Sequence, residues 1–207
     1  MQKYIKNRIL WGYDLNLIAV VSISTLVLIL AHYYRLHIDF PRATELIYYL
    51  LVPLAAGFLL FRDKPGNYGI RIGHWKSALI LTTACLAAML AILYGASKIP
   101  QFSSYYHTQV IDWPDLLLDA VLYMFAWEFF FRGYMLFGLE KSIGKSAIFV
   151  QAIPFVLLHL HKPLLETLAC IPMGFVFGYI AYRTRSFLPC FIIHFGFYVM
   201  TFPFTNY

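Results

Sequence analysis

The chain has 207 residues, of which 61% are hydrophobic and only 13% are charged. Soluble domains carry about 25% charged residues, so this composition excludes an ordinary soluble protein and indicates a polytopic membrane protein. In such a chain a net charge of +6 reflects basic cytoplasmic loops and not a nucleic-acid partner. We therefore expect contact with membrane lipid and no binding of nucleic acid.

Apolar runs divide the chain into candidate membrane spans. A helix needs about 20 residues to cross a bilayer, and seven runs reach or approach that length. They cover residues 15–33, 46–61, 77–94, 116–137, 147–160, 164–182 and 188–204. The fifth run is the shortest, so the expected number is about seven, with six to eight allowed. The predicted fold is an all-α, polytopic transmembrane helical bundle that forms a single domain over residues 1–207.

The segments between the spans have distinct characters. Residues 62–76 are rich in glycine and basic side chains, which predicts a surface loop or a short amphipathic piece. Residues 95–114 are polar with several tyrosines, which is typical of the membrane interface. Residues 138–145 are expected to form a turn.

The fourth span has a strong start signal. Asp112 and Pro114 favour the beginning of a helix, and Asp115 is favourable in its first turn. We interpret Asp115 and Asp119 as residues at the start of the helix, near the lipid headgroups.

The distribution of basic residues predicts an orientation. With the N-terminus inside, eleven lie in inner loops: Lys3, Lys6, Arg8, Arg62, Lys64, Arg71, Lys76, Lys141, Lys145, Arg183 and Arg185. Four lie in outer loops: Arg35, Arg42, Lys98 and Lys162. Cytoplasmic loops carry the excess of Lys and Arg, so we expect the N-terminus in the cytoplasm and the C-terminus outside. The first span has no cleavage site of small residues after it and is expected to remain as an anchor.

Two charged residues lie inside the fourth span. Glu128 and Arg132 are four residues apart and share one helix face, where each can offset the other's charge. A charge at membrane depth costs about 2.5–3.5 kcal/mol even on the mildest scale, so such residues normally face the interior. The pair alone fits an ion pair that fixes helix packing as well as it fits a functional site.

Histidines in later spans supply possible partners. His159 ends the fifth span, and His194 lies in the last span with Tyr198 one turn beyond it. A lone histidine in an apolar helix is more often a packing residue, but two histidines, a glutamate and an arginine over three spans favour convergence on an internal cavity. A carboxylate with a histidine can hold water and take its proton, and a second histidine with a nearby donor can stabilise an oxyanion. This chemistry would hydrolyse a peptide bond.

The order of these residues resembles the CPBP family, the CAAX-type (type II prenyl-protein) intramembrane proteases. The matches are Glu128, Arg132 and Gly133, then Phe155 with His159, then His194. The segments 67–73 and 185–189 also look like the family, and the likeness covers roughly residues 77–207, the expected catalytic core.

The resemblance implies a membrane-embedded glutamic endopeptidase of a bacterial cytoplasmic membrane. Its substrate would be a protein or peptide with a membrane-embedded or lipidated segment. Glu128 and His159 would activate water, His194 and Tyr198 would form the oxyanion site, and Arg132 would orient Glu128. The family's first motif usually has two adjacent glutamates, whereas Trp127 stands in place of the first here, and Tyr198 stands in place of an asparagine.

Two other classes of function stay open. The chain could be a non-proteolytic, CPBP-like scaffold or immunity-type protein. It could also bind a metal or haem through His159 and His194, because imidazole suits zinc, iron and copper. Against a metal, the carboxylate of the site has an arginine beside it, and the three cysteines (Cys85, Cys170 and Cys190) lack CxxC or CxxH spacing and fit buried packing positions. We expect no cofactor and no metal.

Overall fold

The computed structural model describes residues 9–10, 12–108 and 110–206, and over these residues the chain is almost entirely helical. One short antiparallel pair, β1 (Ile9–Leu10) and β2 (Tyr13–Asp14), precedes the first helix. The first half of the chain forms α1 (Leu15–Tyr33), α2 (Ala43–Glu45), the π-helical η2 (Leu46–Leu51), α3 (Val52–Phe61), the 3₁₀ turn η3 (Pro65–Tyr68), α4 (Trp75–Ala96) and α5 (Pro100–Tyr106). The second half forms α6 (Trp113–Glu128), the π-helical η4 (Phe129–Met135), α7 (Leu136–Ile143), the 3₁₀ turn η5 (Gly144–Ser146), α8 (Ala147–Val150), α9 (Ala152–Leu157), α10 (Leu164–Thr184) and α11 (Leu188–Asn206).

Five helical stretches in the described part are long and apolar enough to cross a membrane. They are Leu15–Tyr33, Ala43–Phe61, Trp75–Ala96, Leu164–Thr184 and Leu188–Asn206. The all-α class and an integral membrane protein are thereby confirmed, whereas the count of seven stays a prediction. The predicted fourth span lies in the helical run from α6 to α7, which η4 divides. The predicted fifth span is divided at Gln151 into two short helices of four and six residues.

Local signals in the sequence explain where several helices begin and end. The Asp112 side chain accepts a hydrogen bond from the Asp115 amide and Pro114 lies in the first turn, which confirms the predicted start of α6. The turn predicted at residues 138–145 is wrong over residues 138–143, because α7 continues to Ile143. Leu139 on this extension is fully buried, and Glu140 and Lys141 pair with residues from other loops, so tertiary contacts extend the helix.

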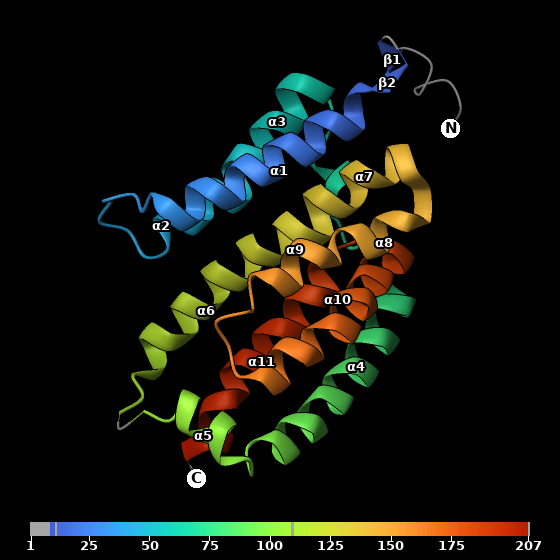
Figure 1. Ribbon diagram of the computed structural model, residues 1–207. Coiled ribbons are helices and arrows are strands. Elements are labelled where there is room, and N and C mark those ends of the chain that lie inside the picture. The colour runs from blue at the N-terminus through green and yellow to red at the C-terminus, as the bar shows by residue number, and fades with distance from the viewer. Residues whose placement is uncertain (1–8, 11, 109, 207) are drawn as a thin grey trace.

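Figure 1 shows the run from α6 to α7 extending along the molecule, with α1 and α3 on one side and α4, α10 and α11 on the other. The N-terminal strands and the C-terminus lie at opposite ends. At the N-terminal end the loop after α3 meets the end of α10, where the His74 amide donates to the Thr184 carbonyl. At the other end Tyr106 of α5 donates to Glu166 of α10. The charged side chains of the loops thus gather at the two ends of the bundle.

Glycines in η4 and in the loop after α3 allow this loop to pack tightly against η4 and the end of α10. A Cβ on Gly73, which has φ +65°, would lie 2.1 Å from the Thr184 carbonyl oxygen, and one on Gly133 would lie 2.8 Å from the Tyr68 carbonyl oxygen. Ser186 donates to the Gly69 carbonyl and accepts from the Leu188 amide at the start of α11. Segments 67–73 and 185–189 therefore brace the helices that carry Glu128 and His194.

Candidate active site

Three of the predicted site residues form a buried, hydrogen-bonded trio. Glu128 is the last residue of α6 and Arg132 lies one turn on in η4, and both side chains are 0% exposed. Arg132 Nη1 donates to Glu128 Oε1 at 3.2 Å, and the same oxygen lies 2.6 Å from Nδ1 of His194 on α11. Because an ionised carboxylate accepts hydrogen bonds, it favours a proton on His194 Nδ1 and leaves Nε2 as the atom available for proton transfer.

The backbone at the trio departs from an α-helix. The π-helical segment η4 begins directly after Glu128 and contains Arg132 and Gly133. Such segments are rare and occur frequently at functional sites. The three phenylalanines that open η4 are fully buried, so the departure lies inside the protein and not on a lipid-facing surface.

The trio has unused hydrogen-bonding capacity. Among the described residues, Glu128 Oε2 and Arg132 Nε and Nη2 are buried without a hydrogen-bond partner. Aromatic rings line the guanidinium instead: Arg132 Cζ lies 4.0 Å from the centroid of Phe155 and 5.1 Å from that of Phe177. These contacts stabilise the positive charge but leave polar atoms able to bind water or a substrate.

His159 lies just beyond the end of α9. Its Nδ1 is 2.7 Å from the Phe155 carbonyl oxygen, so Nδ1–H donates there and Nε2 is left as an acceptor. The Thr167 hydroxyl donates to the His159 carbonyl at 2.6 Å and fixes the loop from the side of α10. The Phe155 ring has its centroid 4.7 Å from that of His159 and 6.4 Å from that of His194. The short fifth helix therefore brings both imidazoles against one phenyl ring.

Tyr198 lies apart from this group. No hydrogen bond or ring contact in the described structure joins Tyr198 to Glu128, His159 or His194. The Tyr198 ring packs against Phe202, and the charged groups that act on its hydroxyl are Asp119 and Arg42, in and beside the first half of α6. The oxyanion role that the sequence assigned to Tyr198 therefore has no contact in its support.

Trp127 was noticed in the sequence only as a departure from the family pattern. Its ring packs against His159 at 6.0 Å between centroids, and against Phe155 at 6.3 Å. The side chain is 6% exposed, and its indole Nε1–H has no partner among the described residues. Neither composition nor spacing can reveal an unpaired donor, so nothing in the sequence beyond the unusual residue itself indicates this feature.

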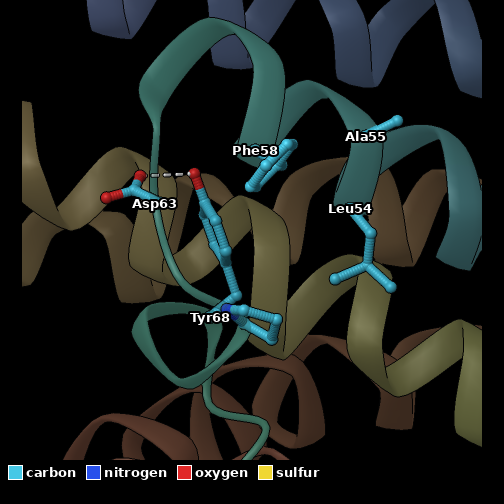
Figure 2. Close-up of a pocket in the computed structure, with 6 residues that line it drawn as sticks. Leu54, Ala55, Phe58, Asp63 and Tyr68 are labelled. Carbon is cyan, nitrogen blue, oxygen red and sulfur yellow. Dashed lines mark hydrogen bonds between the residues drawn. The ribbon is translucent and has the colours of Figure 1, made fainter.

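A separate pocket lies between α3 and the loop that follows it (Figure 2). It has a volume of about 310 Å³ and is lined by Leu54, Ala55, Phe58, Asp63, Pro65 and Tyr68. Asp63, its carboxylate, accepts a hydrogen bond from the Tyr68 hydroxyl at 2.8 Å and also binds Lys141. Since this carboxylate is already paired, the pocket is an apolar groove without a group poised for chemistry.

The described residues include no group of three or more His, Cys, Asp or Glu side chains that could hold a metal ion. The free thiols of Cys170 and Cys190 are buried, as expected for packing residues, and Cys85 is partly buried. The polar chemistry that the fold assembles is therefore that of a carboxylate, an arginine and two imidazoles.

A comparison with family models matches residues 109–200 to the Rce1-like family, described as type II CAAX prenyl endopeptidase Rce1-like. This stretch contains Glu128, Arg132, His159, His194 and Tyr198. No curated protein and no solved structure matches the chain. The match over residues 109–200 supports the resemblance to the CPBP family of CAAX-type intramembrane proteases.

Proposed function

We propose that the protein is an intramembrane endopeptidase that hydrolyses a peptide bond in a membrane-associated or lipidated protein or peptide. The observation that carries this proposal is the 2.6 Å contact between the fully buried Glu128 and the partly buried His194. A carboxylate bound to Nδ1–H of an imidazole is the arrangement that raises the basicity of Nε2 and orients it. The match to a family of endopeptidases supports the same reaction class.

In the proposed mechanism His194 Nε2 takes a proton from water while the water oxygen attacks the substrate carbonyl carbon. Glu128 stabilises the imidazolium that forms, and its Oε2 offers the water a second acceptor. Arg132 orients Glu128 through the hydrogen bond from Nη1 to Oε1. The proton then moves to the leaving nitrogen as the tetrahedral intermediate collapses and the C–N bond breaks.

His159 is assigned to the same water or to the leaving group. Its Nδ1–H is bound to the Phe155 carbonyl, so Nε2 is the acceptor that remains. The sequence suggested that Glu128 and His159 act on water and that His194 faces the oxyanion. In the present assignment His194 acts with Glu128 on the water, and His159 acts on the same water or on the leaving group. The direct contact between Glu128 and His194 favours this assignment.

The decisive experiment replaces the carboxylate. Purified protein in lipid nanodiscs would be incubated with quenched peptides, with and without a farnesylated cysteine, and cleavage followed by fluorescence. Glu128→Gln keeps the size of the side chain and should lower kcat by about 10³-fold, within the range for loss of acid–base assistance. Glu140→Gln is the matched control, because Glu140 is bound to Arg185 at the end of α7 and takes no part in the site.

Cleavage at the wild-type rate by Glu128→Gln would reject the mechanism. An inactive wild-type protein, combined with a cellular phenotype that survives Glu128→Gln, would instead support a scaffold. Unfolding temperatures of both variants separate lost chemistry from lost fold.

We also propose that the catalytic core spans residues 77–207 and that the basic end of the bundle faces the cytoplasm of a bacterium. In support, α4 packs against α10 and α11, so it belongs with the helices of the family match. The ion pair of Lys141 with Asp63 and the contact of Arg71 with the Arg185 carbonyl gather the inner loops at one end, while Lys3, Lys6 and Arg8 lie outside the described residues. Labelling of cysteines introduced at Lys64 and Lys98 with an impermeant maleimide would test the orientation, since only the outer site should react in intact cells.

A further inference from the structure

The hydrolysis proposed above needs a donor for the oxyanion, and the residues expected to supply one do not fit well. His159 Nδ1–H is bound to a backbone carbonyl, and His194 Nδ1 faces Glu128. Among the described residues, Tyr198 makes no hydrogen bond or ring contact with either histidine. Arg132 has unpaired N–H groups, but its charge is committed to Glu128 and its guanidinium lies against the rings of Phe155 and Phe177.

Trp127 is a neighbouring side chain with an uncharged, unpaired donor. Indole Nε1–H can donate and cannot accept, so an acceptor atom has to come from elsewhere. The donor is buried among aromatic rings, with Tyr49 at 5.5 Å, Tyr123 at 5.4 Å and Phe131 at 5.0 Å between centroids. A buried donor without a partner is unfavourable, and in native proteins it is often a sign that a ligand atom occupies the position.

The position of the indole links it to the reaction. Its ring meets the His159 ring edge-on, with an interplanar angle of 78°, and the Phe155 ring contacts both Trp127 and His194. Unpaired buried atoms in this part of the protein include three donors (Trp127 Nε1, Arg132 Nε and Nη2) and the acceptor Glu128 Oε2. Donors exceed acceptors here, so the site as a whole lacks an acceptor such as a carbonyl oxygen.

We propose that Trp127 Nε1–H binds the carbonyl oxygen of the scissile peptide bond and stabilises the oxyanion of the tetrahedral intermediate. This inference rests on the proposed function. Trp127 stands in place of the family's first glutamate, and its proposed role is that of a hydrogen-bond donor instead of a base. Base chemistry is then left to the contact between Glu128 and His194.

The test removes the donor and keeps the ring. Replacement of the Trp127 indole by benzothiophene puts sulfur in place of the N–H at nearly the same shape, and Trp127→Phe is the simpler companion. Loss of one oxyanion donor typically lowers kcat by about 10²–10³-fold, so both variants should show such a loss with KM little changed. Tyr123→Phe is the matched control, because it removes a hydroxyl from the same aromatic cluster and keeps the ring; it should retain wild-type kcat.

A second measurement does not depend on turnover. A peptide aldehyde, which presents a carbonyl and forms a tetrahedral hydrate, would be added to protein labelled with ¹⁵N at its four tryptophans. The indole N–H signal that is missing in Trp127→Phe should move downfield. An unmoved signal, or wild-type kcat in the benzothiophene protein, would overturn the role of Trp127 and leave the proposed hydrolysis standing if Glu128→Gln is inactive. If Glu128→Gln cleaves normally while the indole signal moves, the hydrolytic mechanism fails and Trp127 remains a carbonyl-binding residue.

Discussion

Three carboxylates at the ends of the bundle differ in their hydrogen bonds from the carboxylate in its middle. Both oxygens of Asp119, Glu140 and Glu166 accept hydrogen bonds, from Arg42, Arg185 and Tyr106 respectively. Glu128 is more deeply buried than any of these, yet only its Oε1 is bound and Oε2 has no partner within the described structure.

The difference distinguishes carboxylates that stabilise the fold from a carboxylate that is available for a reaction. A carboxylate that joins two helices is most stabilising when every oxygen is paired, and Asp119, Glu140 and Glu166 satisfy that condition, whereas Glu45 binds Arg35 and Arg42 through Oε1. A catalytic carboxylate has to keep an atom available for water or substrate. Incomplete pairing of a fully buried carboxylate therefore indicates function, whereas burial alone would not.

The strongest test of this contrast is Arg132→Met. Removal of one partner from a buried ion pair leaves an uncompensated charge, and such losses cost about 3–5 kcal/mol. The variant should unfold at much lower temperature or lower SDS concentration in detergent micelles, whereas Arg185→Met at the half-exposed end pair should lose about 1 kcal/mol or less.

The double variant Glu128→Gln/Arg132→Met sharpens the result. It removes both charges, so it should recover most of the stability lost in Arg132→Met. A double variant as unstable as the single one would mean that packing of the arginine stem, and not its charge, holds this part of the bundle.

A smaller effect is expected at the loop that braces the site. Gly73→Ala forces a side chain onto a residue with φ +65° and places Cβ against the Thr184 carbonyl. Left-handed backbone alone costs a non-glycine residue about 1–3 kcal/mol, and the clash adds to it. Thermal unfolding of this variant should be compared with that of Gly66→Ala, whose Cβ would meet nothing within 4 Å and which should stay within about 1 kcal/mol of the wild type. Equal stability of the two would show that the loop can shift away from α10.

The sequence predicted the lipid-facing parts of the fold well. The first span was expected at residues 15–33 and is observed at Leu15–Tyr33, because length and apolar character alone define such a helix. Gln151, in contrast, divides the fifth helix while its amide donates to the carbonyls of Ile148 and Gly174. The second of these bonds joins two helices, and no local pattern reports it.

The candidate site was predictable in its members and not in its pairings. Ionisable residues within apolar runs pointed to Glu128, Arg132, His159 and His194, because hydrocarbon disfavours them elsewhere. Which histidine contacts the carboxylate depends on how α11 is rotated against α6. The sequence analysis paired Glu128 with His159, whereas the contact in the structure is with His194. The unpaired indole of Trp127 is likewise a property of its surroundings.

The smallest expected effect concerns Asp63, which pairs with Lys141 at the basic end. Burial acts to raise the pKa of the Asp63 carboxyl, but hydrogen bonds from Lys141, Tyr68 and Asn67 outweigh it and bring the pKa below its ordinary 3.8. Because the folded state holds the ionised form, the stabilisation is present above the unfolded pKa and is lost as the pH falls through the lower folded pKa. Asp63→Asn should therefore lose about 1 kcal/mol of stability at pH 7, and the difference from the wild type should close only below a pH of about 3.8.

Lys141→Met should remove the same stabilisation, and the double variant should lose little more, as measured by SDS unfolding across pH. A difference in stability between Asp63→Asn and the wild type that persists at the lowest pH would assign the stabilisation to packing of the loop. Charge pairing would then not be what distinguishes this end carboxylate from Glu128.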